Sequence, residues 1–200
     1  MSGVIANWDE FAAEWDDDPA ARAYAWAAYE SLVALLAERD MSLADMRVLD
    51  FGCGTGLLVE HLVAAGVASI DAVDTSPAML DVLEDKRVRA GWDHVRTSEQ
   101  LPAAPEGYDL VVCSSVCSFL PDYPGTVRQL VAPLVAGGAF VQWDWELDPD
   151  DDDPHGLTRE AINDALAGAG LIGLHVATAF TVAIDGAEMA PLVGIGSTPS

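Results

Sequence analysis

One turn, placed between a predicted strand and a predicted helix, constrains the fold more than any other stretch of the chain. Met46–Phe51 predicts a short buried strand, and Gly52, Gly54 and Gly56 follow it at alternate positions before an apolar helix begins at Leu57. Glycine accepts a positive φ and allows a ligand to approach the main chain closely. Backbone N–H groups at the start of a helix form a pocket at its positive end. We therefore predict an α/β fold with a ligand site at this turn.

Two carboxylates indicate what kind of ligand this turn takes. Asp50 stands two residues before Gly52, in a G-x-G-x-G pattern that differs from the G-x-G-x-x-G of dinucleotide-binding turns. A carboxylate at this place repels a pyrophosphate and attracts an ammonium or a sulfonium. Asp74 ends a second predicted strand, Ser69–Val73, about twenty residues after the turn. An acid there is placed to accept hydrogen bonds from both hydroxyls of a ribose.

These motifs resemble those of a known enzyme family. Asp50–Gly56 resembles the first motif, and Asp74–Leu80 the second motif, of the Rossmann-like (class I) S-adenosylmethionine-dependent methyltransferases. The resemblance implies a seven-stranded, mostly parallel sheet of order 3-2-1-4-5-7-6, with the last strand antiparallel and helices on both faces. It also implies one domain over residues 1–200, with an N-terminal helical lid (1–42) and a Rossmann-like core (43–200).

The resemblance further implies that S-adenosylmethionine is the cofactor and which residues hold it. The implied cofactor-binding residues are Trp15, Asp50, Gly52, Cys53, Gly54, Gly56, Asp74, Thr75, Met79, Thr97, Ser98, Glu99 and Ser114. The chain departs from the family pattern at two of them. Thr97 stands where an acid usually grips the adenine amino group, so the main chain of Ser98 or the side chain of Glu99 is the substitute. Trp15 stands where a tyrosine is common.

Residues 7–40 are rich in aromatic side chains at helical spacing. The spacing predicts one helix that begins after Asn7 and carries Trp15, and a second helix from about Ala20 to Arg39. The segment around Trp15 resembles the helix that precedes the core domain in many small methyltransferases. The aromatic rings either pack in the core or belong to a lid that walls the cofactor and the acceptor.

The second half of the chain predicts the remaining strands of the sheet. Tyr108–Ser115 is nearly continuous in apolar residues, so we expect a strand buried on both faces. A helix is predicted over Thr126–Val135 and a fifth strand over Ala139–Glu146. Two long strands, 171–184 and 187–195, are predicted to pair through a hairpin turn at Asp185-Gly186.

The predicted reaction is transfer of a methyl group from sulfur to a small-molecule acceptor by in-line displacement, which needs little more than correct positioning of the reactants. Asp144, near the end of the fifth predicted strand, is the candidate general base. Alternatively this part of the strand only packs against a neighbouring helix. Two other functions stay open: a non-catalytic protein that binds S-adenosylmethionine or S-adenosylhomocysteine, and a nicotinamide oxidoreductase. The oxidoreductase needs a Tyr–Lys pair, whereas Lys86 is the only lysine and no tyrosine lies near it in the sequence.

The net charge and the cysteine content limit which partners and which cellular location are expected. The formal net charge is −24, and such a negative field disfavours nucleic acid and anionic membranes as partners. No apolar run approaches the ~18 residues of a membrane span. Three cysteines without metal-type spacing indicate reduced thiols in a cytoplasmic protein. The acidic run Asp148–Pro154 is a poor metal site, so no metal is predicted, and the oligomeric state is not readable.

Overall fold

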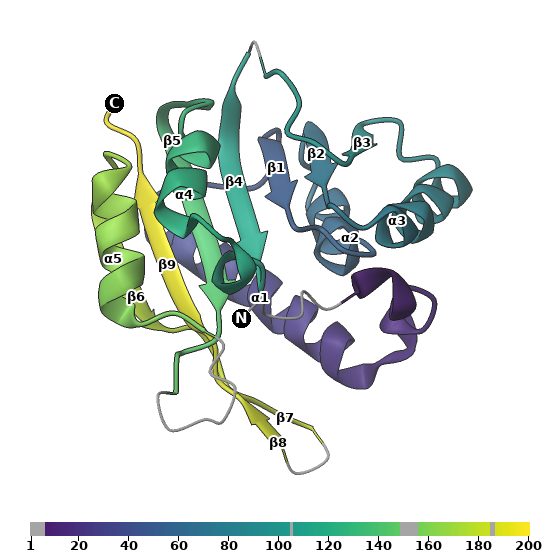
Figure 1. The fold of residues 1–200 in the computed structure, drawn as a ribbon. Helices are drawn as coiled ribbons and strands as arrows, with labels where there is room; N and C mark the ends of the chain where they lie inside the picture. The colour runs from purple at the N-terminus through teal and green to yellow at the C-terminus, as the bar shows by residue number, and fades with distance from the viewer. Residues whose placement is uncertain (1–6, 105, 149–155, 185–186) are drawn as a thin grey trace.

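A seven-stranded sheet forms the centre of the computed structural model, which describes residues 7–104, 106–148, 156–184 and 187–200. The strand order is β3-β2-β1-β4-β5-β9-β6, with β9 antiparallel to both of its neighbours (Figure 1). The predicted order 3-2-1-4-5-7-6 is confirmed, with β9 in the place of the seventh strand. The strands are β1 (Arg47–Phe51), β2 (Ser69–Val73), β3 (Val95–Ser98), β4 (Tyr108–Ser114), β5 (Leu134–Asp144), β6 (Ile172–Thr178) and β9 (Leu192–Ser197).

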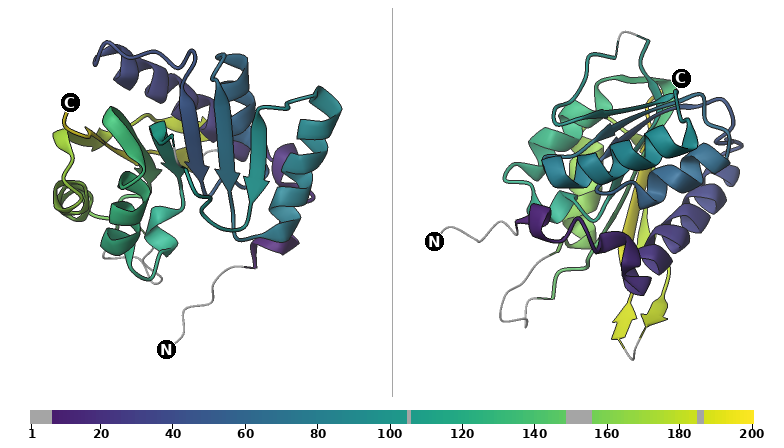
Figure 2. Two further views of the ribbon diagram at one scale, coloured as in Figure 1. Left: turned by 90° about the horizontal axis from the view of Figure 1, so that it is seen from above. Right: turned by 90° about the vertical axis from the view of Figure 1, so that its right-hand side faces the viewer.

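Helices cover both faces of this sheet, as the resemblance implied (Figure 2). One face packs against α1 (Pro19–Ala37), α2 (Leu57–Ala64) and α3 (Pro77–Ala90). The other face packs against α4 (Tyr123–Val131) and α5 (Arg159–Gly168). Successive strand residues alternate between the two cores, so Val48 faces α1 and α2 whereas Leu49 faces the opposite core. The continuous apolar runs of the central strands follow from this two-sided burial.

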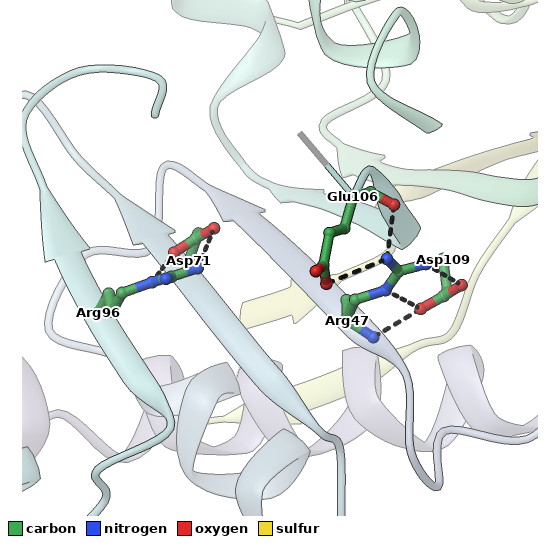
Figure 3. Close-up of polar contacts among 5 residues, drawn as sticks. All are labelled: Arg47, Asp71, Arg96, Glu106 and Asp109. Atoms are coloured by element: carbon green, nitrogen blue, oxygen red, sulfur yellow. Dashed lines mark hydrogen bonds and ion pairs between the residues drawn. The ribbon is translucent and has the colours of Figure 1, made fainter. Parts of the chain in front are cut away.

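Ion pairs fix neighbouring strands in register (Figure 3). The guanidinium of Arg47, at the start of β1, forms a bidentate contact with Asp109 of β4, at 3.0 and 3.1 Å. Arg96 of β3 binds Asp71 of β2, and the Tyr108 hydroxyl donates to the same carboxylate at 2.7 Å. These contacts lie along the sheet away from the carboxyl ends of the strands, so they align the strands without occupying the edge where the glycine turn lies.

The N-terminal segment differs from the prediction. Instead of one helix it forms two short 3₁₀ turns, η1 (Trp8–Glu10) and η2 (Trp15–Asp17), and a regular helix begins only at Pro19 of α1. Ala12 is the one buried residue of the segment between them, so an α-helix here would bury almost no apolar stripe. The carboxylate of Asp18 accepts a hydrogen bond from Ala20 N–H, and this cap fixes the start of α1.

Two further elements end at other residues than predicted. The helix α4 stops at Val131, with Ala132 as its C-cap, because the following Pro133 has no backbone N–H with which to continue the helix. Strand β5 accordingly begins at Leu134 and includes Gly137 and Gly138, which lie between the predicted helix and the predicted strand. The division of the chain into a lid and a core stays a prediction.

The predicted C-terminal hairpin is divided into two parts. β6 and β9 join the main sheet, whereas β7 (Val182–Ile184) and β8 (Ala187–Met189) form a separate two-stranded ribbon. Pro191 cannot donate to a ladder, and its carbonyl instead accepts from Ala179 N–H at the division. The turn Asp185-Gly186, and all but the first residue of the acidic run Asp148–Pro154, lie outside the described residues.

Among the described residues no helix is both long and apolar enough to cross a bilayer.

Candidate functional site

The glycine turn connects β1 to α2 at the carboxyl edge of the sheet. Gly52, Gly54 and Gly56 have φ values of 77°, 54° and 84°, a region that favours glycine. Two of these positions also lack space for a side chain. A Cβ at Gly52 would lie 2.7 Å from the side chain of Val116, and a Cβ at Gly56 would lie 2.4 Å from Leu83. Gly54 differs, since apart from Gly54 and its two chain neighbours no heavy atom of the described residues lies within 4 Å of a Cβ built there.

Asp74 lies at the mouth of this turn. Its two carboxylate oxygens accept hydrogen bonds from Gly54 N–H at 2.8 Å and from Ser76 N–H at 2.9 Å. The turn is also tied to the end of β2, because Gly52 N–H and Cys53 N–H both donate to the carbonyl of Val73. The two motifs that the sequence placed twenty residues apart therefore meet at one site.

Asp50 is buried behind the same turn without a hydrogen-bond partner. Its side chain is 1 % exposed, and neither carboxylate oxygen has a donor among the described residues. Burial raises the pKa of Asp50 to about 7, and the negative charge of Asp74 adds to the effect. The nearby Cys53 thiol has its pKa raised by burial and by both carboxylates. A buried carboxylate without partners is costly for the fold, and a cation placed against it would remove this cost.

The predicted second-motif residues lie around the start of α3. Ser76 caps the helix by accepting from Met79 N–H, and Pro77 occupies the first turn. Met79 is buried at 3 % exposure, whereas Thr75 is exposed. The roles of Met79 and Thr75 in binding a cofactor stay predictions.

The predicted third-motif residues follow β3. Ser98 lies beside Asp74, because Asp74 N–H donates to the Ser98 carbonyl at 3.2 Å. The Ser98 hydroxyl is held locally by Gln100, while Glu99 is exposed. Thr97 points its hydroxyl toward Glu84 of α3, at 3.4 Å. The structure thus brings the main chain of Ser98 to the site, and the predicted contacts of these side chains to an adenine stay predictions.

A hydroxyl pair at the end of β4 was missed from the sequence. Ser114, a predicted site residue, is half-buried, and the next residue, Ser115, has a φ of 54°. The Ser115 hydroxyl donates to the Tyr24 hydroxyl of α1 at 2.8 Å. Tyr24 packs against the rings of Trp145 and Phe180, with centroids 5.5 and 5.3 Å away. Burial raises the pKa of Tyr24, so its phenol stays protonated.

Asp144, the candidate base, is fully buried at the end of β5. Its carboxylate accepts from Ser118 N–H and from Trp145 N–H, each at 2.9 Å. Burial raises the pKa of Asp144, and these hydrogen bonds partly offset the rise. Asp144 thereby shapes the short turn η3 (Cys117–Phe119), and its role as a base stays a prediction.

The N-terminal segment brings carboxylates to the site where the sequence had singled out an aromatic ring. Trp15 packs edge-on against Trp8, with ring centroids 6.0 Å apart. The contacts to the loops come from Asp9, which binds Ser76, and from Asp16, which binds Thr55. Helical spacing in the sequence shows which residues share a face of a helix. It does not show that Asp9 and Asp16, two acids of an irregular segment, contact the loops that hold Ser76 and Thr55.

Two surface hollows lie away from the glycine turn. One of about 330 Å³ is at the opposite edge of the sheet and includes Met41 and Gly138 in its lining. The other, of about 230 Å³, lies between α1 and α2 and is lined in part by Trp26 and His61. Neither includes a predicted site residue in its lining. The site is therefore defined by the loops, carboxylates and hydrogen bonds at the carboxyl edge.

Comparison with known proteins finds methyltransferases. Residues 49–140 match a family described as "Methyltransferase domain". The chain is 33% identical over 102 residues to a ubiquinone biosynthesis O-methyltransferase from Xanthomonas euvesicatoria, covering 49% of this chain and 42% of that protein. It is 36% identical over 103 residues to the protein of that name from Aromatoleum aromaticum, covering 48% and 44%. The chain thus spans less than half the length of these relatives.

Solved structures share the fold over nearly the whole chain. A Haloferax volcanii protein in complex with the Trm112 methyltransferase activator has a TM-score of 0.74 at 18% identity, covering 99% of this chain and 100% of that one. The magnesium protoporphyrin IX methyltransferase of Synechocystis, with bound S-adenosylmethionine, has a TM-score of 0.68 at 15% identity, covering 99% and 100%. Residues 49–140 are therefore similar to a methyltransferase domain, and the whole sheet has the strand order that the resemblance to Rossmann-like methyltransferases implied.

Proposed function

We propose that this protein transfers a methyl group from S-adenosylmethionine to a small-molecule acceptor. The observation that carries the proposal is the buried carboxylate of Asp50, which has no hydrogen-bond partner among the described residues and lies beside a glycine turn whose mouth holds Asp74. An ammonium is the group that such a carboxylate favours, and vicinal ribose hydroxyls are donors that suit Asp74.

Different residues of the proposed site bind different parts of the cofactor. Asp50 pairs with the ammonium of the cofactor's amino acid part. The open space in front of Gly54 lets this part of the cofactor approach the protein backbone closely. Asp74 accepts the ribose hydroxyls while exchanging its present bonds to Gly54 and Ser76. Met79 and the main chain of Ser98 lie where the adenine is expected. When bound, the cofactor supplies a methyl group already activated by a positively charged sulfur.

The acceptor side combines aromatic walls with neutral hydroxyls. Tyr24, Trp145 and Phe180 pack together next to the hydroxyl of Ser115. Tyr24 stays protonated, so it donates a hydrogen bond and does not remove a proton. We propose a planar small acceptor, methylated at oxygen, a choice that the names of the sequence relatives support. Holding the acceptor in line and excluding water then supply most of the catalysis. The cytoplasmic location stays a prediction.

A radiochemical transfer assay tests this function. The full chain is incubated with methyl-tritiated S-adenosylmethionine and a panel of small phenols, catechols, amines and thiols. Labelled product from a planar phenol or catechol, absent with non-planar cyclohexanediol, is the expected result. Stoichiometric binding of S-adenosylhomocysteine with no labelled product from any acceptor would instead support a non-catalytic binding protein.

A further inference from the structure

The N-terminal segment, residues 7–18, is attached to both loops that we propose to hold the cofactor. At one end, the Asp9 carboxylate accepts from the Ser76 hydroxyl and from Ala78 N–H. At the other end, the Asp16 carboxylate accepts from the Thr55 hydroxyl at 2.6 Å. Ser76 lies two residues after Asp74, and Thr55 lies inside the glycine turn. The segment is therefore bound to both motifs, on the side of the sheet edge where it lies below α3 (Figure 1).

An ion pair holds the second attachment. The Lys86 ammonium of α3 lies 2.5 Å from the Asp16 carboxylate and 2.7 Å from that of Glu60 in α2. The Lys86 side chain is only 12% exposed, so solvent screens these pairs less than it screens a surface pair. Lys86 is also the only lysine of a chain with net charge −24. Without it, the carboxylates of Asp16 and Glu60 would lose the cation that contacts both of them.

The same segment reaches the acceptor side of the site. The Trp8 ring packs edge-on against Phe119 of η3, with centroids 5.6 Å apart, and against Trp15. The residues just before η3 are in contact with the glycine turn, because the Val116 side chain fills the space beside Gly52. Residues 7–18 thus contact elements on both sides of the proposed cofactor site.

We propose that Lys86 is a positioning residue that latches residues 7–18 onto the glycine turn through Asp16, and that release of this latch controls cofactor exchange. The inference rests on the proposed function. Lys86 acts through Asp16 and Thr55 and does not touch the reacting atoms. Loss of the latch therefore speeds release of the nucleoside product and raises the KM for the cofactor, while kcat at saturation does not fall.

Stopped-flow measurement of S-adenosylhomocysteine release tests the latch. In Lys86→Met and in Asp16→Asn, we expect release to be about tenfold faster, a change of about 1.4 kcal/mol that suits the loss of one partly buried ion pair. Because both changes break the same contact, the double variant is expected to lie within about twofold of either single variant. Lys86→Arg keeps the charge and should restore most of the slow release.

Two controls separate a latch from general stabilisation. Glu60→Gln removes the α2 partner of Lys86 but leaves the Asp16 contact, so release should stay within about twofold of wild type. Arg89→Met removes a cation from the same helix, where the guanidinium binds the helix carbonyl of Asp85, and should change nothing. Unchanged release in both Lys86→Met and Asp16→Asn would show that the proposal is wrong. A lower melting temperature of Lys86→Met in that case would show that Lys86 is structural.

A readout without cofactor keeps the two proposals distinguishable. Amide hydrogen exchange of residues 8–18 in the ligand-free chain should accelerate in Lys86→Met and Asp16→Asn but not in Glu60→Gln. If the wild type binds no S-adenosylhomocysteine, the proposed function fails, and the exchange pattern still decides whether Lys86 holds the segment. Equal exchange in wild type and all variants would overturn the latch itself.

Discussion

The carboxylates of Asp50 and Asp74 lie at the same glycine turn, but only Asp74 has hydrogen-bond donors. Asp74 accepts from Gly54 and Ser76, whereas neither oxygen of Asp50 has a partner among the described residues. A fold keeps an unpaired buried carboxylate at a cost in stability. Asp74 therefore already holds the turn together, whereas the carboxylate of Asp50 is left for a ligand alone.

Replacing this unpaired charge should stabilise the fold and weaken ligand binding. The folded-state pKa of Asp50, about 7, lies above its ordinary value of 3.8, so ionisation opposes folding. This penalty is absent below about pH 4, grows between pH 4 and 7, and is complete above pH 7. In Asp50→Asn the melting temperature should rise by a few degrees at pH 8 and stay unchanged near pH 4, as measured by circular dichroism.

A paired carboxylate provides a control of opposite sign. The Arg47 guanidinium lowers the pKa of Asp109 through hydrogen bonds and charge. This stabilisation is present above the unfolded pKa and is lost as the pH falls through the lowered folded value. Asp109→Asn should therefore lower the melting temperature at pH 8. A decrease in Asp50→Asn as well would contradict the assignment of Asp50 as a destabilising charge.

Cofactor affinity should depend on pH through Asp50. A ligand cation favours the ionised carboxylate, so binding below pH 7 must release the proton of Asp50. The affinity for S-adenosylhomocysteine should rise from pH 6 to pH 8 in the wild type and change little in Asp50→Asn. Calorimetry at pH 6.5 in two buffers of different ionisation enthalpy measures the released proton directly. Equal heats in both buffers would show that Asp50 does not titrate on binding.

Two glycines of the turn should respond differently to alanine. A Cβ at Gly52 meets Val116, so the melting temperature of Gly52→Ala is expected to lie below those of the wild type and of Gly54→Ala. At Gly54 the space is open, and only the positive φ is unfavourable, at about 1–2 kcal/mol. Gly54→Ala should therefore fold, with a moderately lower melting temperature, but lose S-adenosylhomocysteine binding. Retained binding in a folded Gly54→Ala would place the ligand elsewhere.

Two substitutions of Asp144 test whether its carboxylate holds η3 in place or acts as a general base. Asp144→Ala leaves the amides of Ser118 and Trp145 without their acceptor, which should cost about 2–4 kcal/mol in urea unfolding. Asp144→Asn keeps one carbonyl acceptor and should cost clearly less. If instead both variants are as stable as wild type, the buried carboxylate does not hold η3, and its predicted role as a base gains weight.

The sheet and the central site were readable from the sequence because their signals are local. The strand before Gly52, the alternation of glycines, and Asp74 at the end of β2 each combine a residue type with a backbone requirement. Their pairing in space follows from parallel strands that end at one edge. The same local logic explains the start of α5, where the Thr158 hydroxyl caps the helix by accepting from Ala161 N–H.

The contacts that sequence reasoning missed are long-range and made by exposed or irregular segments. The Tyr24–Ser115 bond joins residues far apart in the chain and needs an unusual φ at Ser115. The Asp16 contact to Lys86 depends on a 3₁₀ turn, because the segment buries too little apolar surface to form an α-helix. No periodicity encodes either contact. A lone lysine in an acidic chain was the one available signal, and its partner could not be read from spacing.

Calorimetric titration of S-adenosylhomocysteine into the wild type and into Asp74→Asn tests the central claim most directly. We expect one molecule to bind per wild-type chain, and we expect the affinity of Asp74→Asn to fall by at least about tenfold, because an amide cannot accept two ribose hydroxyls as a carboxylate does. No binding to the wild type, or equal affinity in the variant, would contradict the assignment of this edge as the cofactor site.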